Sequence, residues 1–187
     1  MKSVAYIQAR GGSKRIPEKN KRLWHGIPFV ADAILTAEAS CLFDLIAVSS
    51  DDTEILDIAR RFKALPVLRS EKMSGDTVTD AELAHEILPP LKRFELVCKL
   101  YPCVPLLKPI DLRRAYIALI ASDAEGIRAV DKDGNDAGAF WLYWMTDKPL
   151  DKLRIIDYTL DVSQDINTYA DIQEAERKYD KNRKKTT

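Results

Sequence analysis

The 187-residue chain is 46% hydrophobic, which suits one compact domain with its own core. Its 29 lysines and arginines balance its 29 aspartates and glutamates, so no overall field draws it to nucleic acid or to a membrane surface. Three cysteines without a CxxC pair argue against a disulfide framework and a structural zinc site. No apolar run approaches the ~20 residues of a membrane helix, and residues 4–9 are too short for a signal peptide, so we expect a cytoplasmic protein.

Short apolar runs and amphipathic segments alternate through the first two thirds of the chain. Apolar runs typical of buried strands occupy residues 4–7, 45–48, 66–68 and 96–100. Apolar residues at helical spacing occupy residues 29–39, 53–62, 78–89 and 111–121. Asp52 stands where it can cap the second of these helices. Because strands and helices alternate with short connections, we predict an α/β fold: a doubly wound, mostly parallel sheet flanked by helices.

The last third of the chain is less regular. The aromatic run FWLYW (140–144) predicts a buried strand, and residues 172–179 predict a closing helix. Residues 131–134 contain an Asp-Gly pair and predict a tight turn. No linker or internal repeat divides the chain. We therefore expect a single domain over residues 1–180 and a charged tail over residues 181–187.

Four polar segments follow the predicted strands, at residues 10–20, 49–52, 69–76 and 101–105. In open parallel sheets, ligands bind beyond the carboxyl ends of the strands. We expect these segments to meet at one crevice, provided that the strand order places their strands side by side.

The first of these segments, RGGSKRIPEKN (10–20), is strongly basic. With the two residues after it, it sets six basic side chains against the single acid Glu18: Arg10, Lys14, Arg15, Lys19, Lys21 and Arg22. Glycines let backbone N–H groups approach phosphate oxygens, Arg10 can bind two oxygens at once, and Lys14 and Lys19 act as point charges. The segment matches neither GxxxxGK[ST] nor GxGxxG. It predicts a phosphate-binding loop, and the alternative is a solvated basic turn.

Six motifs in order resemble one family of enzymes. YIQARGGSKRIPEKN (6–20) resembles the N-terminal signature of the cytidylyltransferases that activate acidic sugars, the CMP-sialic acid synthetase family. The other five follow in that family's order: VSSDDTEILDIA (48–59), LRSEKMSGDTVTD (68–80), YPCVP (101–105), NDAGAFW (135–141) and QDINTYADIQEAE (164–176). The YPxxP and DAGxF forms resemble the branch that makes CMP-pseudaminic acid. The resemblance covers nearly the whole chain.

The resemblance implies an enzyme that joins CMP from CTP to the anomeric hydroxyl of a 2-keto sugar acid, such as pseudaminic or sialic acid, and releases pyrophosphate with Mg²⁺. Carried over by position, Arg10 and Lys19 contact the triphosphate and stabilise the charge that develops at the α-phosphate. The implied nucleotide-binding positions are Ala9, Arg10, Gly11, Gly12, Ser13, Lys14, Asn20, Arg69 and Ser74. Among these, Asn20 is expected to contact the ribose or base, and Arg69 and the Met73-Ser74 pair to read cytosine.

The QDIN segment supplies the expected Mg²⁺ ligands, Asp165 and Asn167. Mg²⁺ prefers a few carboxylates together with substrate phosphate oxygens, and alternate residues of an extended segment point to the same side. The family has Asp where this chain has Asn167, whose amide oxygen can ligate but carries no charge. The alternative is that Asp165 supports a turn and Asn167 begins the final helix. Asp51 and Asp52 could also reach a metal or sugar, although a capping role is favoured for Asp52.

The segment before the DAG motif is short in this chain. Family members insert a longer segment there, which helps to form the acceptor pocket and the dimer interface, whereas here only residues 131–134 separate Val130 from Asn135. The identity of the sugar acid is therefore not carried over, and the homodimer that the family implies is weakened.

Two other functions are weighed against this one. A non-catalytic CTP- or CMP-sugar-binding protein of the same fold is the first alternative, because of Asn167 and the short segment. Nucleic-acid binding through the basic loop is the second. The balanced net charge and the lack of an aromatic or helical readout pattern disfavour it.

Overall fold

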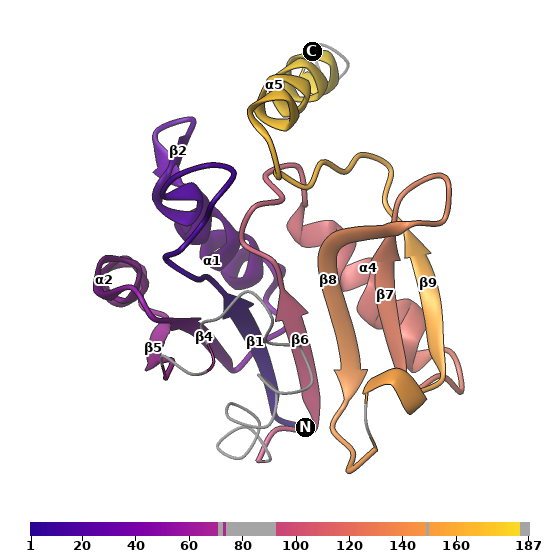
Figure 1. The fold of residues 1–187 in the computed structure, drawn as a ribbon. Helices are drawn as coiled ribbons and strands as arrows, with labels where there is room; N and C mark the ends of the chain where they lie inside the picture. The colour runs from indigo at the N-terminus through magenta and orange to yellow at the C-terminus, as the bar shows by residue number, and fades with distance from the viewer. Residues whose placement is uncertain (71–72, 74–92, 149, 184–187) are drawn as a thin grey trace.

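The computed structural model describes residues 1–70, 73, 93–148 and 150–183 (Figure 1). The helix expected over residues 78–89 lies outside these ranges, as does Ser74. Among the described residues, no helix is both long and apolar enough to cross a membrane.

A seven-stranded sheet in the order β5-β4-β1-β6-β8-β7-β9 forms the centre of the molecule (Figure 1). Its strands are β1 (Ser3–Gln8), β4 (Leu45–Ser50), β5 (Leu65–Leu68), β6 (Leu96–Leu100), β7 (Gly126–Val130), β8 (Asp136–Trp144) and β9 (Ile155–Thr159). Four of the six pairings are parallel, and only β8 runs antiparallel to its neighbours β6 and β7. The prediction of a mostly parallel sheet flanked by helices is confirmed.

Within the described ranges, four longer helices accompany the sheet: α1 (Phe29–Ser40), α2 (Thr53–Arg61), α4 (Pro109–Ile120) and α5 (Tyr169–Arg183). Helices α1, α2 and α4 place their apolar side chains in one core with the central strands. A second cluster, which contains Val4, Tyr6, Val97 and Tyr143, lies apart from this core. Because successive strand residues point to opposite faces, Val4 and Tyr6 of β1 belong to this cluster and Ala5 and Ile7 to the main core.

The start of α2 confirms the predicted cap. The carboxylate of Asp52 accepts hydrogen bonds from the backbone N–H groups of Glu54 (2.8 Å) and Ile55 (3.4 Å). The predicted turn at residues 131–134 is also present. Asp131 donates its N–H to the carbonyl of Asn135, and Gly134 has a φ of +83°, which suits glycine.

Several elements differ from the sequence-based expectation. Strand β8 begins at Asp136 rather than at residue 140, and α5 runs from Tyr169 to Arg183, so the first three residues of the expected tail are helical. Strand β9 was not predicted, because as an edge strand none of its residues is fully buried. The opening basic segment continues into a one-turn helix, η1 (Lys19–Lys21), and a small hairpin of β2 (Leu23–Trp24) and β3 (Ile27–Pro28).

Candidate active site

The basic segment that follows β1 is anchored to the end of β4. The backbone N–H of Ala9 donates to the carbonyl of Ser49 (3.0 Å), and that of Gly11 donates to the carboxylate of Asp51 (2.9 Å). A Cβ on Gly11 would lie 2.7 Å from the Cβ of Asp52, so this approach requires glycine. A Cβ on Gly12 would meet nothing within 4 Å, which leaves the loop open on that side.

Several N–H groups expected to hold the nucleotide are already used within the protein. Those of Ala9 and Gly11 bond to β4 and Asp51, and that of Ser13 donates to the carbonyl of Gly11. In this conformation these groups shape the loop, whose open side is at Gly12.

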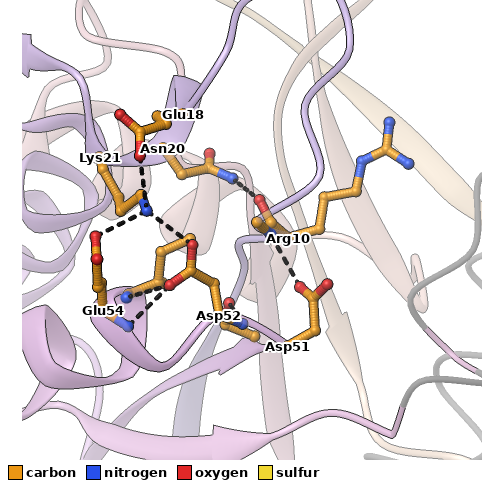
Figure 2. Close-up of polar contacts among 10 residues, drawn as sticks. Arg10, Glu18, Asn20, Lys21, Asp51, Asp52 and Glu54 are labelled. Carbon is orange, nitrogen blue, oxygen red and sulfur yellow. Dashed lines mark hydrogen bonds and ion pairs between the residues drawn. The ribbon is translucent and has the colours of Figure 1, made fainter.

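The side chain of Asn20 holds the basic loop in place through two hydrogen bonds. Its Nδ2 donates to the carbonyl of Arg10 (2.8 Å), and its Oδ1 accepts from the Cys103 thiol (3.1 Å) (Figure 2 shows the bond to Arg10). Both Asn20 and Cys103 are buried. Burial raises the pKa of Cys103 to about 12, so the thiol stays protonated and acts as a donor. The amide of Asn20 thus fixes the position of Arg10.

Lys21 holds the loop to helix α2. Its ammonium group lies 2.8 Å from Glu54, 3.0 Å from Asp52 and 3.2 Å from Glu18. Hydrogen bonds to Glu54 and Asp52 raise its pKa. Figure 2 shows that the Arg10 side chain extends away from this network. Among the six basic residues of this segment, Lys21 therefore serves to attach the loop to α2.

Residues far apart in the sequence bring the basic loop against the QDIN segment. Lys19 Nζ donates to the carbonyl of Ile166 (2.5 Å) across 147 positions of sequence, and Arg15 donates to Oδ1 of Asn167 (3.0 Å). Ile16 and Ile166 are both fully buried in one cluster, and Ile166 donates its N–H to the carbonyl of Cys103 (3.0 Å). The basic loop, the 101–105 segment and the QDIN segment therefore meet at one place.

Asp165 and Asn167 contact each other directly. The Asn167 amide donates to Oδ2 of Asp165, so the two side chains do point to the same side. Burial raises the pKa of Asp165, and the hydrogen bond from Asn167 and the charge of Lys19 oppose the shift. A Cβ on Gly138 would lie 3.0 Å from Oδ2 of Asp165, so the glycine of the DAG motif makes room for this carboxylate.

The start of α5 depends on Asp171 and not on the Asn167 side chain. The carboxylate of Asp171 accepts from the N–H of Asn167 (2.9 Å) and from the N–H and hydroxyl of Thr168. The Asn167 side chain bridges Arg15 and Asp165 instead. The sequence also allowed Asn167 to be the first residue of the final helix. In the structure that helix, α5, begins at Tyr169.

Arg69 lies at the neighbouring strand end. It is buried, its Nε and Nη2 donate to the hydroxyl and carbonyl of Ser49 (3.3 Å each), and its backbone N–H bonds to Ser50. The Ser49 carbonyl also accepts a hydrogen bond from the N–H of Ala9. Ser49 therefore connects Arg69, at the end of β5, with the basic loop. Ser74 lies outside the described residues.

A divalent cation would find one carboxylate in this site. Across the part of the chain that the structure describes, no group of three or more His, Cys, Asp or Glu side chains could hold a metal alone. Asp165, cradled by Gly138, with Asn167 beside it, fits an ion that takes its remaining ligands from a bound triphosphate and water.

Sequence reasoning missed three residues of this site. Gly138 stands against Asp165 with a φ of +57°, Cys103 supports Asn20, and Asp171 holds the QDIN backbone. Gly138 could have been found from its place in the DAG motif. Asp171 contacts residues three and four positions before it, a local capping signal that was overlooked, whereas the contact of Cys103 with Asn20 joins distant segments.

One family model and several curated relatives match most of the chain. The family model Cytidylyltransferase matches residues 4–179. Pseudaminic acid cytidylyltransferase from Campylobacter jejuni is 38% identical over 130 residues, which cover 67% of this chain and 56% of that protein. CMP-N,N'-diacetyllegionaminic acid synthase from Legionella pneumophila is 33% identical over 155 residues, 72% of this chain and 66% of that protein. The chain thus spans about half to two thirds of the length of these relatives.

Solved structures show the same fold. A CMP:2-keto-3-deoxy-manno-octonic acid synthetase complexed with CTP aligns over 97% of this chain and 100% of its own, with a TM-score of 0.71 and 12% identity. The 4-diphosphocytidyl-2C-methyl-D-erythritol synthase of Anaerococcus prevotii aligns over 96% of this chain and 98% of its own, with a TM-score of 0.68 and 15% identity. With the family model matched from residue 4 to residue 179, the chain belongs to the cytidylyltransferase family.

Proposed function

We propose that the protein transfers CMP from CTP to the anomeric hydroxyl of a 2-keto sugar acid, a nonulosonic acid such as pseudaminic or sialic acid, with release of pyrophosphate. The observation that carries the proposal is the meeting of the basic loop with the QDIN segment, through Lys19 and Ile166 and through Arg15 and Asn167. The names of the relatives, which include cytidylyltransferases for pseudaminic and N-acylneuraminic acids, support the acceptor class.

The basic loop is proposed to hold the triphosphate. Arg10 extends from a backbone fixed by Asn20 and can bind two phosphate oxygens, while Lys14 and Lys19 add point charges. Lys19 is bonded to a neutral carbonyl, which a phosphate oxygen can replace as the better partner. Fixed positive groups stabilise the charge that develops on the α-phosphate during transfer.

The cytidine is proposed to lie toward β4 and β5. Arg69 follows β5 and donates a hydrogen bond to Ser49. The carbonyl of Ser49 also accepts a hydrogen bond from the N–H of Ala9 in the basic loop. Asn20 supports the ribose side of the site through the Arg10 backbone. Arg69 and Ser74 are proposed to read the base.

Mg²⁺ is proposed to bind here with Asp165 as its carboxylate ligand; the amide oxygen of Asn167, which accepts a hydrogen bond from Arg15, would have to leave that partner to become a second ligand. Mg²⁺ at this position would neutralise phosphate charge and polarise the α-phosphate. Gly138 leaves space for the ionised Asp165 carboxylate, and Arg15 and Asp171 hold the Asn167 side chain and backbone. No covalent enzyme intermediate is required, because positioning and charge stabilisation suffice for direct attack by the acceptor hydroxyl.

The test is a transfer assay on the folded protein with CTP, Mg²⁺ and a panel of sugar acids that includes pseudaminic and N-acetylneuraminic acids. We expect pyrophosphate and a CMP-sugar to form together with at least one of them. Neither product with any acceptor, from protein that binds CTP, would overturn the proposed transfer.

A non-catalytic CTP- or CMP-sugar-binding protein is the second candidate. It is favoured by one observation: the Asn167 amide donates to Asp165, which leaves a single carboxylate at the metal position. Calorimetry and the transfer assay on wild type and Asn167→Asp distinguish the two. CTP binding without turnover in both proteins supports the second candidate, whereas turnover that appears only in Asn167→Asp assigns the defect to the metal site.

A further inference from the structure

Cys103 lies in the segment between β6 and α4, where the basic loop and the QDIN segment come together. Because β6 pairs with β1, the segment that follows β6 leaves the sheet beside the loop that follows β1. The Cys103 thiol donates to Oδ1 of Asn20 (3.1 Å), and its carbonyl accepts from the N–H of Ile166 (3.0 Å). A single residue is therefore bonded to the basic loop on one side and to the QDIN segment on the other.

The thiol decides which way the Asn20 amide faces. An amide has a donor end and an acceptor end of almost the same shape, so its hydrogen-bond partners set its orientation. The carbonyl of Arg10 accepts from Nδ2 (2.8 Å, Figure 2), and the thiol donates to Oδ1. Asn20 is 5% exposed and Cys103 is 3% exposed. Removal of the thiol would leave Oδ1 buried without this donor, an unfavourable state that a change in the amide orientation would relieve.

The carbonyl of Cys103 holds the opposite side of the site. It accepts from Ile166, which follows Asp165 in the chain and is fully buried in the same cluster as Cys103. The carbonyl of Ile166 accepts in turn from Lys19 (2.5 Å). The two peptide groups that flank Ile166 are thus fixed, one by Cys103 and the other by Lys19.

Charges from both segments reach the thiol. Burial raises the pKa of Cys103 to about 12, the positive charge of Lys19 opposes this shift, and the negative charge of Asp165 adds to it. Cys103 thus stands between a proposed triphosphate ligand and the proposed metal ligand. Its thiol stays protonated at neutral pH, so it remains a donor to Asn20.

We propose that Cys103 is a positioning residue of the transfer reaction: it fixes Arg10, through Asn20, relative to Asp165, through Ile166. The inference rests on the proposed function, because Arg10 is the proposed ligand of the triphosphate and Asp165 that of the metal. Both must act on one α-phosphate, so a small displacement of either lowers the rate of the chemical step more than the affinity for CTP. Cys103 acts through its neighbours and forms no covalent bond in the reaction.

The test compares Cys103→Ala with Cys98→Ala. Cys98 lies in the middle of β6, is also fully buried and packs in the main core. Each variant loses one buried thiol, so a purely structural role for Cys103 predicts similar kinetics in both.

The transfer assay uses CTP, Mg²⁺ and pseudaminic and N-acetylneuraminic acids. We expect the kcat of Cys103→Ala to fall at least about tenfold, with its KM for CTP within about threefold of wild type. Cys98→Ala should keep both values within about twofold of wild type. Cys103→Ser should recover most of the lost kcat, because its hydroxyl can also donate to Asn20.

Hydrogen exchange of the Asn20 side-chain amide, followed by NMR, gives a readout that does not need turnover. We expect exchange at least about tenfold faster in Cys103→Ala than in wild type, and unchanged in Cys98→Ala. That result supports the role of Cys103 even if no sugar acid is transferred and the proposed function fails. Unchanged exchange in Cys103→Ala overturns this role.

Three kinetic outcomes also overturn the role of Cys103 and leave the proposed function standing. They are a wild-type kcat in Cys103→Ala, an equal fall in Cys103→Ala and Cys98→Ala, and a Cys103→Ser variant as slow as Cys103→Ala. If Cys103→Ala does not fold, Cys103→Val takes its place in both experiments, since valine fills the space and lacks the donor.

Discussion

At the scale of single residues, the two adjacent glycines of the basic loop have different tasks. A Cβ on Gly11 would come within 2.7 Å of the Cβ of Asp52, whereas one on Gly12 would meet nothing within 4 Å. Gly11 therefore makes room for the approach of the loop to helix α2. Gly12 leaves the open face on which a phosphate can lie.

The glycine pair gives a matched test. Gly11→Ala should lower the free energy of unfolding by about 1–3 kcal/mol, because Asp52 must move and both its cap to α2 and its ion pair with Lys21 are disturbed. It should also weaken CTP binding. Gly12→Ala should leave stability within about 0.5 kcal/mol of wild type. Denaturant unfolding measures both, and equal losses in the two variants would contradict this account of the loop.

Asp32, on the first turn of α1, carries an unfavourable buried charge. Burial raises the pKa of its carboxyl from 3.8 to about 6. In the unfolded chain it ionises near pH 4, so the folded state loses stability as the pH rises from about 4 to about 6, and the loss stays constant above that.

Asp32→Asn removes this penalty. We expect the variant to be more stable than wild type by about 2 kcal/mol at pH 8, and the gain to disappear near pH 4. Unfolding by urea across this pH range measures the difference. Glu38→Gln, on an exposed position of the same helix, is the control and should show no comparable pH-dependent gain. A gain from Asp32→Asn that does not vary with pH would rule out the charge as its cause.

At the scale of elements, α5 controls the QDIN segment but is attached by few contacts. Ala175 is its one buried residue in the range that the structure describes. One of its further attachments is to the β2–β3 hairpin, where Tyr179 packs against Trp24 and His25, and Glu176 lies 3.2 Å from His25. The hairpin therefore positions the helix that follows Asn167.

Tyr179→Ala should loosen this attachment. We expect faster hydrogen exchange in α5 and a fall in transfer rate larger than the loss of CTP affinity, because Asp165 and Asn167 are displaced while the basic loop stays in place. Asp180→Ala, on the exposed side of the same helix, should change neither. Equal exchange rates in Tyr179→Ala and wild type would show that the hairpin does not hold α5.

The elements also show what could be predicted from the sequence. The buried apolar runs of β1, β4 and β6 and the cap at Asp52 are local signals, and all are confirmed. Strand β9 was not predicted, because an edge strand does not require a run of buried apolar residues. The contact between Lys19 and Ile166, and that between Asn20 and Cys103, could not be predicted, because they depend on which strands become neighbours in the sheet.

At the scale of the whole molecule, the balanced charge of the chain coexists with a local basic loop. The structure disperses part of that local charge: Lys21 pairs with three acids, Arg15 bonds to Asn167, and Arg22 stacks on Tyr169. The proposed phosphate-binding side chains, Arg10, Lys14 and Lys19, would hold one small polyphosphate and not a nucleic-acid backbone. Fluorescence anisotropy with generic double-stranded DNA should therefore show no binding at physiological salt, and tight, steeply salt-dependent binding would contradict this assignment.

The sheet divides the proposed reaction between its two parts. The parallel part, β5-β4-β1-β6, presents the basic loop, Ser49 and Arg69 at one edge, and β8 with the segment after β9 presents Gly138 and Asp165. The proposed cytidylyl transfer requires both parts, because the proposed triphosphate ligands lie in the first and the proposed metal ligands in the second.

The most direct measurement is ³¹P NMR of a single reaction that contains the protein, CTP, Mg²⁺ and pseudaminic acid. The account predicts that the three CTP resonances give way to pyrophosphate and to one phosphodiester resonance of a CMP-sugar. Omitting the sugar acid should abolish the conversion, and Lys19→Ala should slow it at least about a hundredfold. Unchanged CTP in the presence of folded, CTP-binding protein and the full panel of sugar acids would contradict the account.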